Sequence, residues 1–171
     1  GGAVLAQSPA TELTPLTALR LAELALAAGL PEDVLWVVTG RGDVVGQRLV
    51  DHPDVAKIVF TGSTDVGSRV MAGCARRIKP VTLELGGKSA NIVFADADLE
   101  AAAAAAPYGV FDNAGQDCCA RSRILVQRSV LDRFMELFET AVRGVVVADP
   151  ADERSEMGPL ISAAHLQRVA S

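Results

Sequence analysis

The 171-residue chain is 50% apolar and carries 16 basic against 21 acidic side chains, for a formal net charge of −5. This composition is typical of a globular protein with a buried core and excludes a disordered segment. The acidic balance, without any cluster of Lys or Arg, argues against nucleic acid and anionic membrane surfaces as partners. No apolar run reaches the ~20 residues that span a bilayer.

Cysteine and histidine usage bounds the redox setting and the metal chemistry. Three cysteines, two of them adjacent, make a poor disulfide framework, which favours a reducing, cytoplasmic location. The two histidines, His52 and His165, are too far apart for zinc-ligand spacing, so we predict no metal site. The chain starts without Met and ends inside a helix-like run, so we expect a fragment of a longer protein.

The first half of the chain alternates helices and strands. Thr14 and Pro15 are typical of a helix start, and Gly29 of a helix end. The following β-branched run predicts a buried strand over 34–38. Further patterns predict, in order, a helix over 43–52, a strand over 57–60, a helix over 65–76 and a strand over 81–85.

The pattern restarts after Gly86-Gly87. A strand over 91–95 precedes a helix capped by Asp98 that continues toward Asn113 with a kink at Pro107. A strand over 123–127 and a polar loop over 149–157 flank an amphipathic helix over 129–143. Its inward residues are expected to be Leu131, Phe134, Leu137 and Phe138. The alternation predicts an α/β fold with a parallel sheet, and the double glycine a domain boundary after residue 86.

Cys118 is a candidate nucleophile because it follows a Gly-Gln turn, whose backbone N–H groups can face a thiolate or an oxyanion. A free cysteine is more often a small buried apolar residue. Asp117 argues against a reactive Cys118, since a neighbouring anion raises a thiol pKa. Cys119 is the alternative, but adjacent side chains on an extended turn usually face opposite ways.

A glutamate and two glycine-rich turns add weaker signals. Glu84 ends an apolar strand, where a carboxylate is ordinarily solvated or paired with a base such as Lys88; the functional alternative is a general base beside an attacking water. The turns over 40–46 and 62–67 follow strands and precede helices. Such turns are more often structural, and the functional alternative is a pyrophosphate at a helix N-terminus.

Three motifs together are more specific than any of them alone. They are Phe60-Thr61-Gly62-Ser63-Thr64, Leu83-Glu84-Leu85-Gly86-Gly87-Lys88-Ser89 and Gly115-Gln116-Asp117-Cys118. In order and spacing they resemble successive signatures of the NAD(P)-dependent aldehyde dehydrogenase superfamily, and the similarity extends from Glu12 to Ser171. The resemblance implies a partial Rossmann-like sheet in the C-terminal part of an NAD-binding domain (1–86). The N-terminal part of a second α/β, catalytic domain would follow (87–171).

The same resemblance implies the chemistry. Cys118 would attack an aldehyde to give a thiohemiacetal and then a thioester, and its backbone N–H would form half of the oxyanion hole. Glu84 would activate the water that releases a free carboxylic acid. Phosphorylating and coenzyme-A-acylating relatives generally lack this glutamate, so its presence indicates the hydrolytic branch. Asp117 would favour a polar or cationic aldehyde.

The resemblance also implies which residues contact the cofactor. Gly62 and Ser63 would contact the cofactor, Ser63 toward the pyrophosphate, and Val66 would lie toward the adenine. Gly42 and Gly46 match the adenine-side turn, and Leu85 the position near the nicotinamide. Glu12 would bind the ribose hydroxyls and so favour NAD, with NADP not excluded. The lysine usual three residues before that glutamate is replaced by Pro9.

Two further expectations concern the molecule as a whole. A full-length chain would be a homo-oligomer acting on a small aldehyde. The alternative is a catalytically incomplete fragment or pseudoenzyme with a binding or structural role. Unpaired sheet edges in such a fragment predict poor solubility or dependence on a complementary partner.

Overall fold

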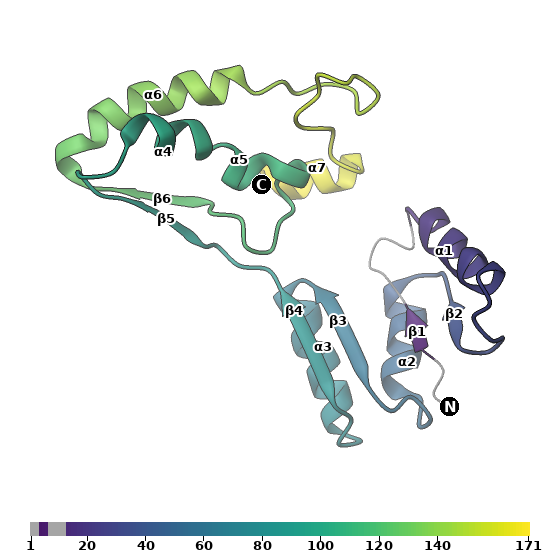
Figure 1. Cartoon of the computed structure of the whole chain (residues 1–171). Helices are drawn as coiled ribbons and strands as arrows, with labels where there is room; N and C mark the ends of the chain where they lie inside the picture. Colours follow the sequence, from purple (N-terminus) through teal and green to yellow (C-terminus); the bar gives the residue numbers. More distant parts are fainter. Residues whose placement is uncertain (1–3, 7–12) are drawn as a thin grey trace. The chain divides into compact units, whose positions relative to one another are not determined.

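The computed structural model describes residues 4–6 and 13–171, which form two compact units, Gly1–Leu85 and Gly86–Ser171 (Figure 1). Each unit combines helices with parallel strands, so the expected α/β class is confirmed. Within the described part of the chain, no helix has the length and apolar character needed to cross a bilayer.

The strands pair in parallel, two by two. Pairing joins β1 to β2, β3 to β4, and β5 to β6. Their bounds are β1 Val4–Ala6, β2 Leu35–Val37, β3 Ile58–Gly62, β4 Val81–Leu85, β5 Ala90–Val93 and β6 Arg123–Val126. Among the described residues there are thus three two-stranded sheets instead of one continuous sheet, because each strand has a hydrogen-bonded neighbour on one side only.

Helix α1 (Leu16–Ala27) ends where the sequence predicts. Gly29 has φ 95°, and its N–H bonds the Leu26 carbonyl while the Leu30 N–H bonds that of Ala25. This pair of bonds is the Schellman arrangement, which satisfies the last carbonyls and favours glycine at the left-handed position. The start differs from expectation, since Pro15 and not Thr14 occupies the N-cap position.

The expected burial of the strand over 34–38 is wrong. Strand β2 is there, but the Trp36 side chain is 50% exposed. In the described part of unit 1, β2 pairs with β1 alone and α1 contacts it, so the side of the strand that carries Trp36 has no cover. A continuous apolar run indicates a strand but does not determine how many layers pack on it.

The core of unit 1 lies between α2 (Gln47–Asp51) and α3 (Thr64–Ala75). Val50 and Cys74 are buried, and a Cβ on Gly73 would come within 2.4 Å of Val50 Cγ1. Glycine at position 73 therefore lets the two helices approach. Lys79, the one buried charged side chain of the described residues, donates from Nζ to the carbonyls of Val50 (2.7 Å) and His52 (2.9 Å) at the end of α2.

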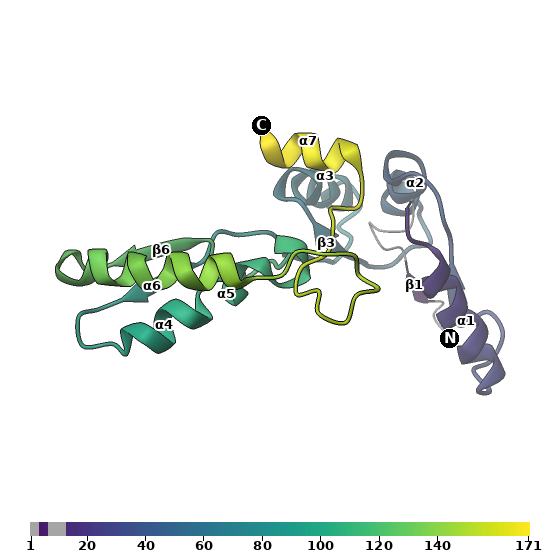
Figure 2. The same cartoon turned by 90° about the horizontal axis from the view of Figure 1, so that it is seen from above.

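Unit 2 packs α4 (Leu99–Ala105) and α6 (Leu131–Gly144) side by side on the β5–β6 pair (Figures 1 and 2). Its core consists of Val93, Ala103, Ala106 and Phe134. As expected, Asp98 caps α4, its carboxylate accepting the Ala101 N–H at 3.0 Å. Pro107 breaks the helix, and a separate short helix, α5 (Tyr108–Phe111), follows it. The last helix is α7 (Ala163–Ala170).

Three of the four residues expected on the inner face of α6 are where the periodicity puts them. Phe134 is buried, Leu137 and Phe138 pack against the core, and the rings of Phe134 and Phe138 stack at 5.7 Å. Leu131 is 38% exposed, contrary to expectation. A 3₁₀ turn over Arg128–Val130 delays the α-helix, so Leu131 is its first residue and lies at the edge of the core.

Candidate functional site

The loop that carries Cys118 begins with an unusual backbone reversal. Asn113, Ala114 and Gly115 are consecutive left-handed residues, with φ of 52°, 55° and 75°. This conformation costs roughly 1–2 kcal/mol for a non-glycine residue, so surrounding contacts must impose it. The reversal ends the run that begins at Asp98 and directs the following residues, 116–122, into a separate loop before β6.

Both ends of that loop are anchored, and its tip is open. The Arg121 N–H bonds the Gly109 carbonyl at 2.9 Å, and the Ala120 N–H bonds the Asp117 carbonyl at 3.2 Å. A Cβ on Gly109 would lie 2.8 Å from the Arg121 guanidinium, so glycine makes room for that side chain. Cys118 and Cys119 are both exposed and unpaired. The thiols are therefore held on a fixed turn and remain accessible to solvent.

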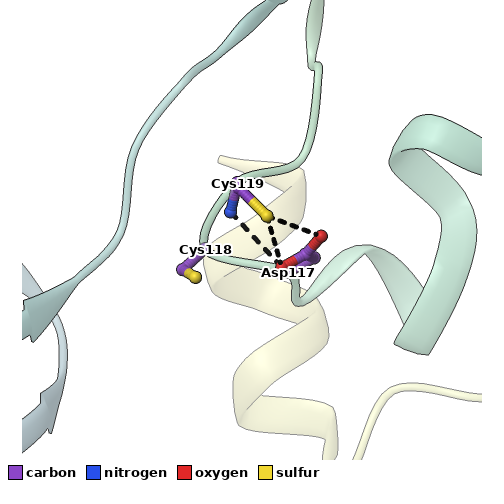
Figure 3. Close-up of side chains that lie close together, drawn as sticks. All are labelled: Asp117, Cys118 and Cys119. Atoms are coloured by element: carbon purple, nitrogen blue, oxygen red, sulfur yellow. Dashed lines mark hydrogen bonds between the residues drawn. The ribbon is translucent and has the colours of Figure 1, made fainter.

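The two cysteines differ in their surroundings. Cys119 donates its thiol to both carboxylate oxygens of Asp117 at 3.3 Å, and its backbone N–H to one of them at 3.3 Å. Figure 3 shows the Cys118 side chain on the opposite side of the loop, as expected for adjacent residues. One polar atom from each of the three residues lies within 4.8 Å of the others. Because the Asp117 carboxylate already accepts these bonds, we assign no metal to the group.

The contacts of Asp117 also shift pKa values in this loop. The hydrogen bond to Asp117, together with its negative charge, raises the pKa of the Cys119 thiol. Conversely, the bonds from the Cys119 thiol and N–H lower the pKa of Asp117, with a smaller contribution from Cys118. The sequence led us to expect that Asp117 would act against Cys118; in the structure its stronger contacts are made to Cys119, and Cys118 makes a weaker one.

The backbone around Cys118 is suited to stabilising an anion. Within Gly86–Ser171, all of which the structure describes, no residue accepts a hydrogen bond from the Cys118 N–H. Gly87 lies beside the loop, since a Cβ there would be 3.4 Å from the Cys118 carbonyl oxygen. Arg123 Nε fixes this segment by bonding the Lys88 carbonyl at 2.8 Å. An available N–H next to the thiol is what an oxyanion hole requires.

Glu84 lies in unit 1, so it and Cys118 belong to separately described parts of the chain. The register of β3 with β4 pairs Glu84 with Thr61, and Leu85 with Gly62. Leu85 packs on α3, where a Cβ on Gly67 would come within 2.6 Å of Leu85 Cδ2. The Glu84 side chain is exposed, so unit 1 does not supply the burial that the general-base interpretation anticipates.

The other expected cofactor residues also lie in unit 1. Ser63 is the N-cap of α3, its hydroxyl accepting the Val66 N–H at 3.3 Å, so two residues predicted separately contact each other. With Gly62 and Leu85 they gather where β3 and β4 end. Gly42 and Gly46 begin and end a short π-helical segment, η2 (Gly42–Gly46), before α2. Glu12 and Pro9 lie outside the described residues.

Glu156 is not among the residues predicted from the sequence. Its carboxylate accepts the Tyr108 hydroxyl and the Val146 N–H, each at 2.8 Å, and these bonds lower its pKa. The same contact raises the pKa of Tyr108. The segment after Glu156 lines one side of an open hollow of about 300 Å³ beside the Cys118 loop. Its lining consists of Asn113, Ala114, Gln116, Glu156, Met157, Gly158, Pro159 and Ile161. The 48-residue separation of Tyr108 from Glu156 leaves no local sequence signal for the contact.

Comparisons with known proteins agree with the sequence motifs. The sequence profile of the Aldehyde dehydrogenase family matches residues 2–171. Betaine aldehyde dehydrogenase 2 of Rhizobium meliloti (strain 1021) is 48% identical over 161 residues, covering 94% of this chain and 33% of that protein. Phenylacetaldehyde dehydrogenase of Pseudomonas fluorescens is 47% identical over 168 residues, covering 98% and 33%.

A solved structure gives the same result. The crystal structure of the NAD-dependent aldehyde dehydrogenase from Sinorhizobium meliloti matches with a TM-score of 0.90 at 50% identity, over 93% of this chain and 32% of that one. The chain therefore spans about a third of the length of these relatives.

Proposed function

Because the chain belongs to the aldehyde dehydrogenase family, we propose that the protein oxidises an aldehyde to a free carboxylic acid with NAD(P)⁺, through a covalent intermediate on Cys118. The observation that carries the proposal is the exposed thiol of Cys118, on an anchored loop and next to a backbone N–H without an acceptor in its own unit.

The residues of the loop divide the first half of the reaction between them. The Cys118 thiolate attacks the carbonyl carbon, forming a C–S bond, and the aldehyde oxygen becomes an oxyanion that the Cys118 N–H stabilises. The product of this step is a thiohemiacetal. Bound NAD(P)⁺ supplies the oxidation that converts it to a thioester. Because the loop is anchored, the Cys118 sulfur and the Cys118 N–H keep the same relative position during the reaction.

Glu84 acts in the second half. Its carboxylate takes a proton from water, the resulting hydroxide attacks the thioester carbon, and the Cys118 sulfur leaves as the acid is released. Exposure of Glu84 within unit 1 leaves its carboxylate open to such a water.

Unit 1 fits a nicotinamide cofactor at the end of the β3–β4 pair. The first N–H groups of α3 have no intrahelical acceptor, and the positive end of the helix favours a pyrophosphate. We propose that Gly62 and Ser63 contact the cofactor there, with Ser63 toward the pyrophosphate, Leu85 toward the nicotinamide, and Val66, Gly42 and Gly46 toward the adenine. Glu12 would hold the adenosine ribose, and its charge favours NAD over NADP.

Less specific assignments of domain, assembly, location and substrate accompany the chemistry. We propose that residues 1–86 belong to the NAD-binding domain and 87–171 to the catalytic domain of a homo-oligomeric, cytoplasmic enzyme. The three free cysteines support a reducing compartment. The curated relatives are named for aldehydes of different character, betaine aldehyde and phenylacetaldehyde, so we propose an aldehyde substrate without choosing one.

Rapid-mixing kinetics of the intact protein with NAD⁺ and a panel of aldehydes test the proposal. We expect Cys118→Ala to abolish NADH formation. Glu84→Gln should retain one burst of NADH per site and then turn over about 10²–10⁴ times more slowly, because deacylation loses its base. Cys119→Ser and Glu23→Gln are matched controls and should retain turnover. Activity in Cys118→Ala, or its loss in Cys119→Ser, would refute the assignment of the nucleophile.

The second candidate is a protein of the same fold that binds the cofactor without catalysis. In such a protein the strained loop backbone and the exposed Cys118 thiol would be present, but no aldehyde would react with the thiol. It predicts NAD⁺ binding by calorimetry with no NADH from any aldehyde, and no change on Cys118→Ala.

A further inference from the structure

The structure distinguishes two adjacent thiols that the sequence leaves equivalent. Both Cys118 and Cys119 are exposed, so access to solvent does not choose between them. What differs is the environment on either side of the loop. Cys119 directs its sulfur to the Asp117 carboxylate, whereas Cys118 lies on the far side of the backbone (Figure 3).

We propose that Asp117 is a positioning residue that selects Cys118 over Cys119 as the reacting thiol, by holding the Cys119 S–H and N–H groups against its carboxylate. The inference rests on the proposed function of Cys118. Asp117 receives three contacts from Cys119, two from the sulfur and one from the backbone nitrogen, all at 3.3 Å. Together they fix both the orientation and the protonation of the neighbouring residue.

The physical basis is the state in which each sulfur reacts. A thiolate is the nucleophile, and a thiol is not. Were Cys119 to ionise, its negative sulfur would lie 3.3 Å from a carboxylate, and the repulsion between the two charges disfavours the thiolate. The charged or titratable groups acting on this pair are Asp117, Cys118 and Arg121. The hydrogen bonds from Cys119 do most to lower the pKa of Asp117, and the positive charge of Arg121 adds to them. Cys118 contributes less than Cys119 to the lowering of the Asp117 pKa.

The backbone contributes a second selective element. The Cys119 N–H is taken by Asp117, whereas the Cys118 N–H has no acceptor in unit 2. If the Cys119 thiolate attacked an aldehyde, the resulting oxyanion would find that residue's own N–H already occupied. Asp117 therefore disfavours Cys119 at the sulfur and at the oxyanion, and leaves the N–H of Cys118 available.

Alkylation of the intact protein by iodoacetamide, mapped by mass spectrometry from pH 6 to 10, tests this without aldehyde or cofactor. In the wild type we expect Cys118 to react faster than Cys119. In Asp117→Asn, which preserves shape and removes the charge, we expect the Cys119 rate at pH 8 to rise about tenfold, more than that of Cys118. The pH of half-maximal Cys119 labelling should fall. Asp112→Asn, which removes an exposed charge from the same segment, should change neither rate.

Cys74 is an internal control for folding. It is 1% exposed, and burial raises its pKa, so it should stay unlabelled in every folded variant. An unchanged Cys119 rate in Asp117→Asn, an equal rise at both cysteines, or the same effect in Asp112→Asn would overturn the proposal. Because the readout needs no turnover, an inactive wild type that still shows the shift would refute the dehydrogenase proposal and leave the Asp117 assignment standing.

Discussion

Lys79→Met is the perturbation whose magnitude the structure sets most directly. Lys79 precedes β4, the strand that ends with Glu84 and Leu85, and its ammonium group binds the carbonyl end of α2. A cation at a helix C-terminus satisfies carbonyls that lack intrahelical donors and interacts favourably with the helix dipole. Methionine has a similar length and keeps the apolar stem, so the substitution removes the three donors and the charge.

The expected loss is about 2–4 kcal/mol in the free energy of unfolding. Two of the bonds are short, 2.7 and 2.9 Å, and a third to the Leu49 carbonyl at 3.5 Å counts for little. A hydrogen bond to a charged group contributes about 1.5–3 kcal/mol, and a buried unsatisfied acceptor costs about 1–3 kcal/mol. Lys79 is only 8% exposed, so removing a buried charge offsets part of that loss.

Urea denaturation of wild type and variant measures this difference, with the exposed Lys57→Met as the matched control, expected within about 0.5 kcal/mol of wild type. Limited proteolysis should also cut α2 and the preceding turn faster in Lys79→Met. A variant as stable as wild type, with α2 equally protected, would show that water or another group satisfies these carbonyls and that Lys79 does not hold the helix.

Three further predictions address the loop, the hollow beside it and the cofactor region. Ala114→Gly should raise the free energy of unfolding by about 0.5–1 kcal/mol, because it relieves a left-handed alanine. The control Ala104→Gly, within α4, should lower the free energy of unfolding by a similar amount. Denaturation experiments that give both changes the same sign would contradict the strain argument. Glu156 has a lowered pKa in the folded state, so its stabilisation is complete above its ordinary value of 4.5 and is lost as pH falls through the lowered one. Thermal melts should therefore show the wild type losing stability more steeply below about pH 4.5 than Glu156→Gln, and parallel curves would refute this role. Gly67→Ala should displace Leu85 and reduce the free energy of unfolding by about 1–3 kcal/mol. It should also weaken NAD⁺ binding, as measured by calorimetry. An unchanged NAD⁺ affinity would show that Leu85 does not belong to the cofactor site.

Local signals in the sequence located most elements and their ends. Gly29 ends α1, Asp98 begins α4 and Pro107 interrupts it, because each acts through its own backbone or its immediate neighbours. The same signals overestimated the burial of Trp36 and Leu131. Burial depends on which elements cover a face, and a strand or helix pattern does not contain that information.

The candidate site likewise contains residues that the sequence predicts and residues that it does not. Cys118, Glu84 and the cofactor residues were predictable as residue types in motifs, and the register that pairs Gly62 with Leu85 follows from adjacent parallel strands. Their roles stay predictions until the variants are measured. Glu156 was not predictable, because its partners Tyr108 and Val146 come together only when α5 and the chain after α6 are packed.

By itself the sequence determined the family and the α/β alternation and supplied the candidate reactive groups, since motif residues and periodicity are properties of the chain read locally. Tertiary structure decided which of two adjacent sulfurs is held by a carboxylate. That choice depends on a three-residue left-handed reversal and an anchor at Gly109, which orient the loop in space. Electrostatic and hydrogen-bond energies vary over ångströms, so the assignment of Asp117 to Cys119 required coordinates.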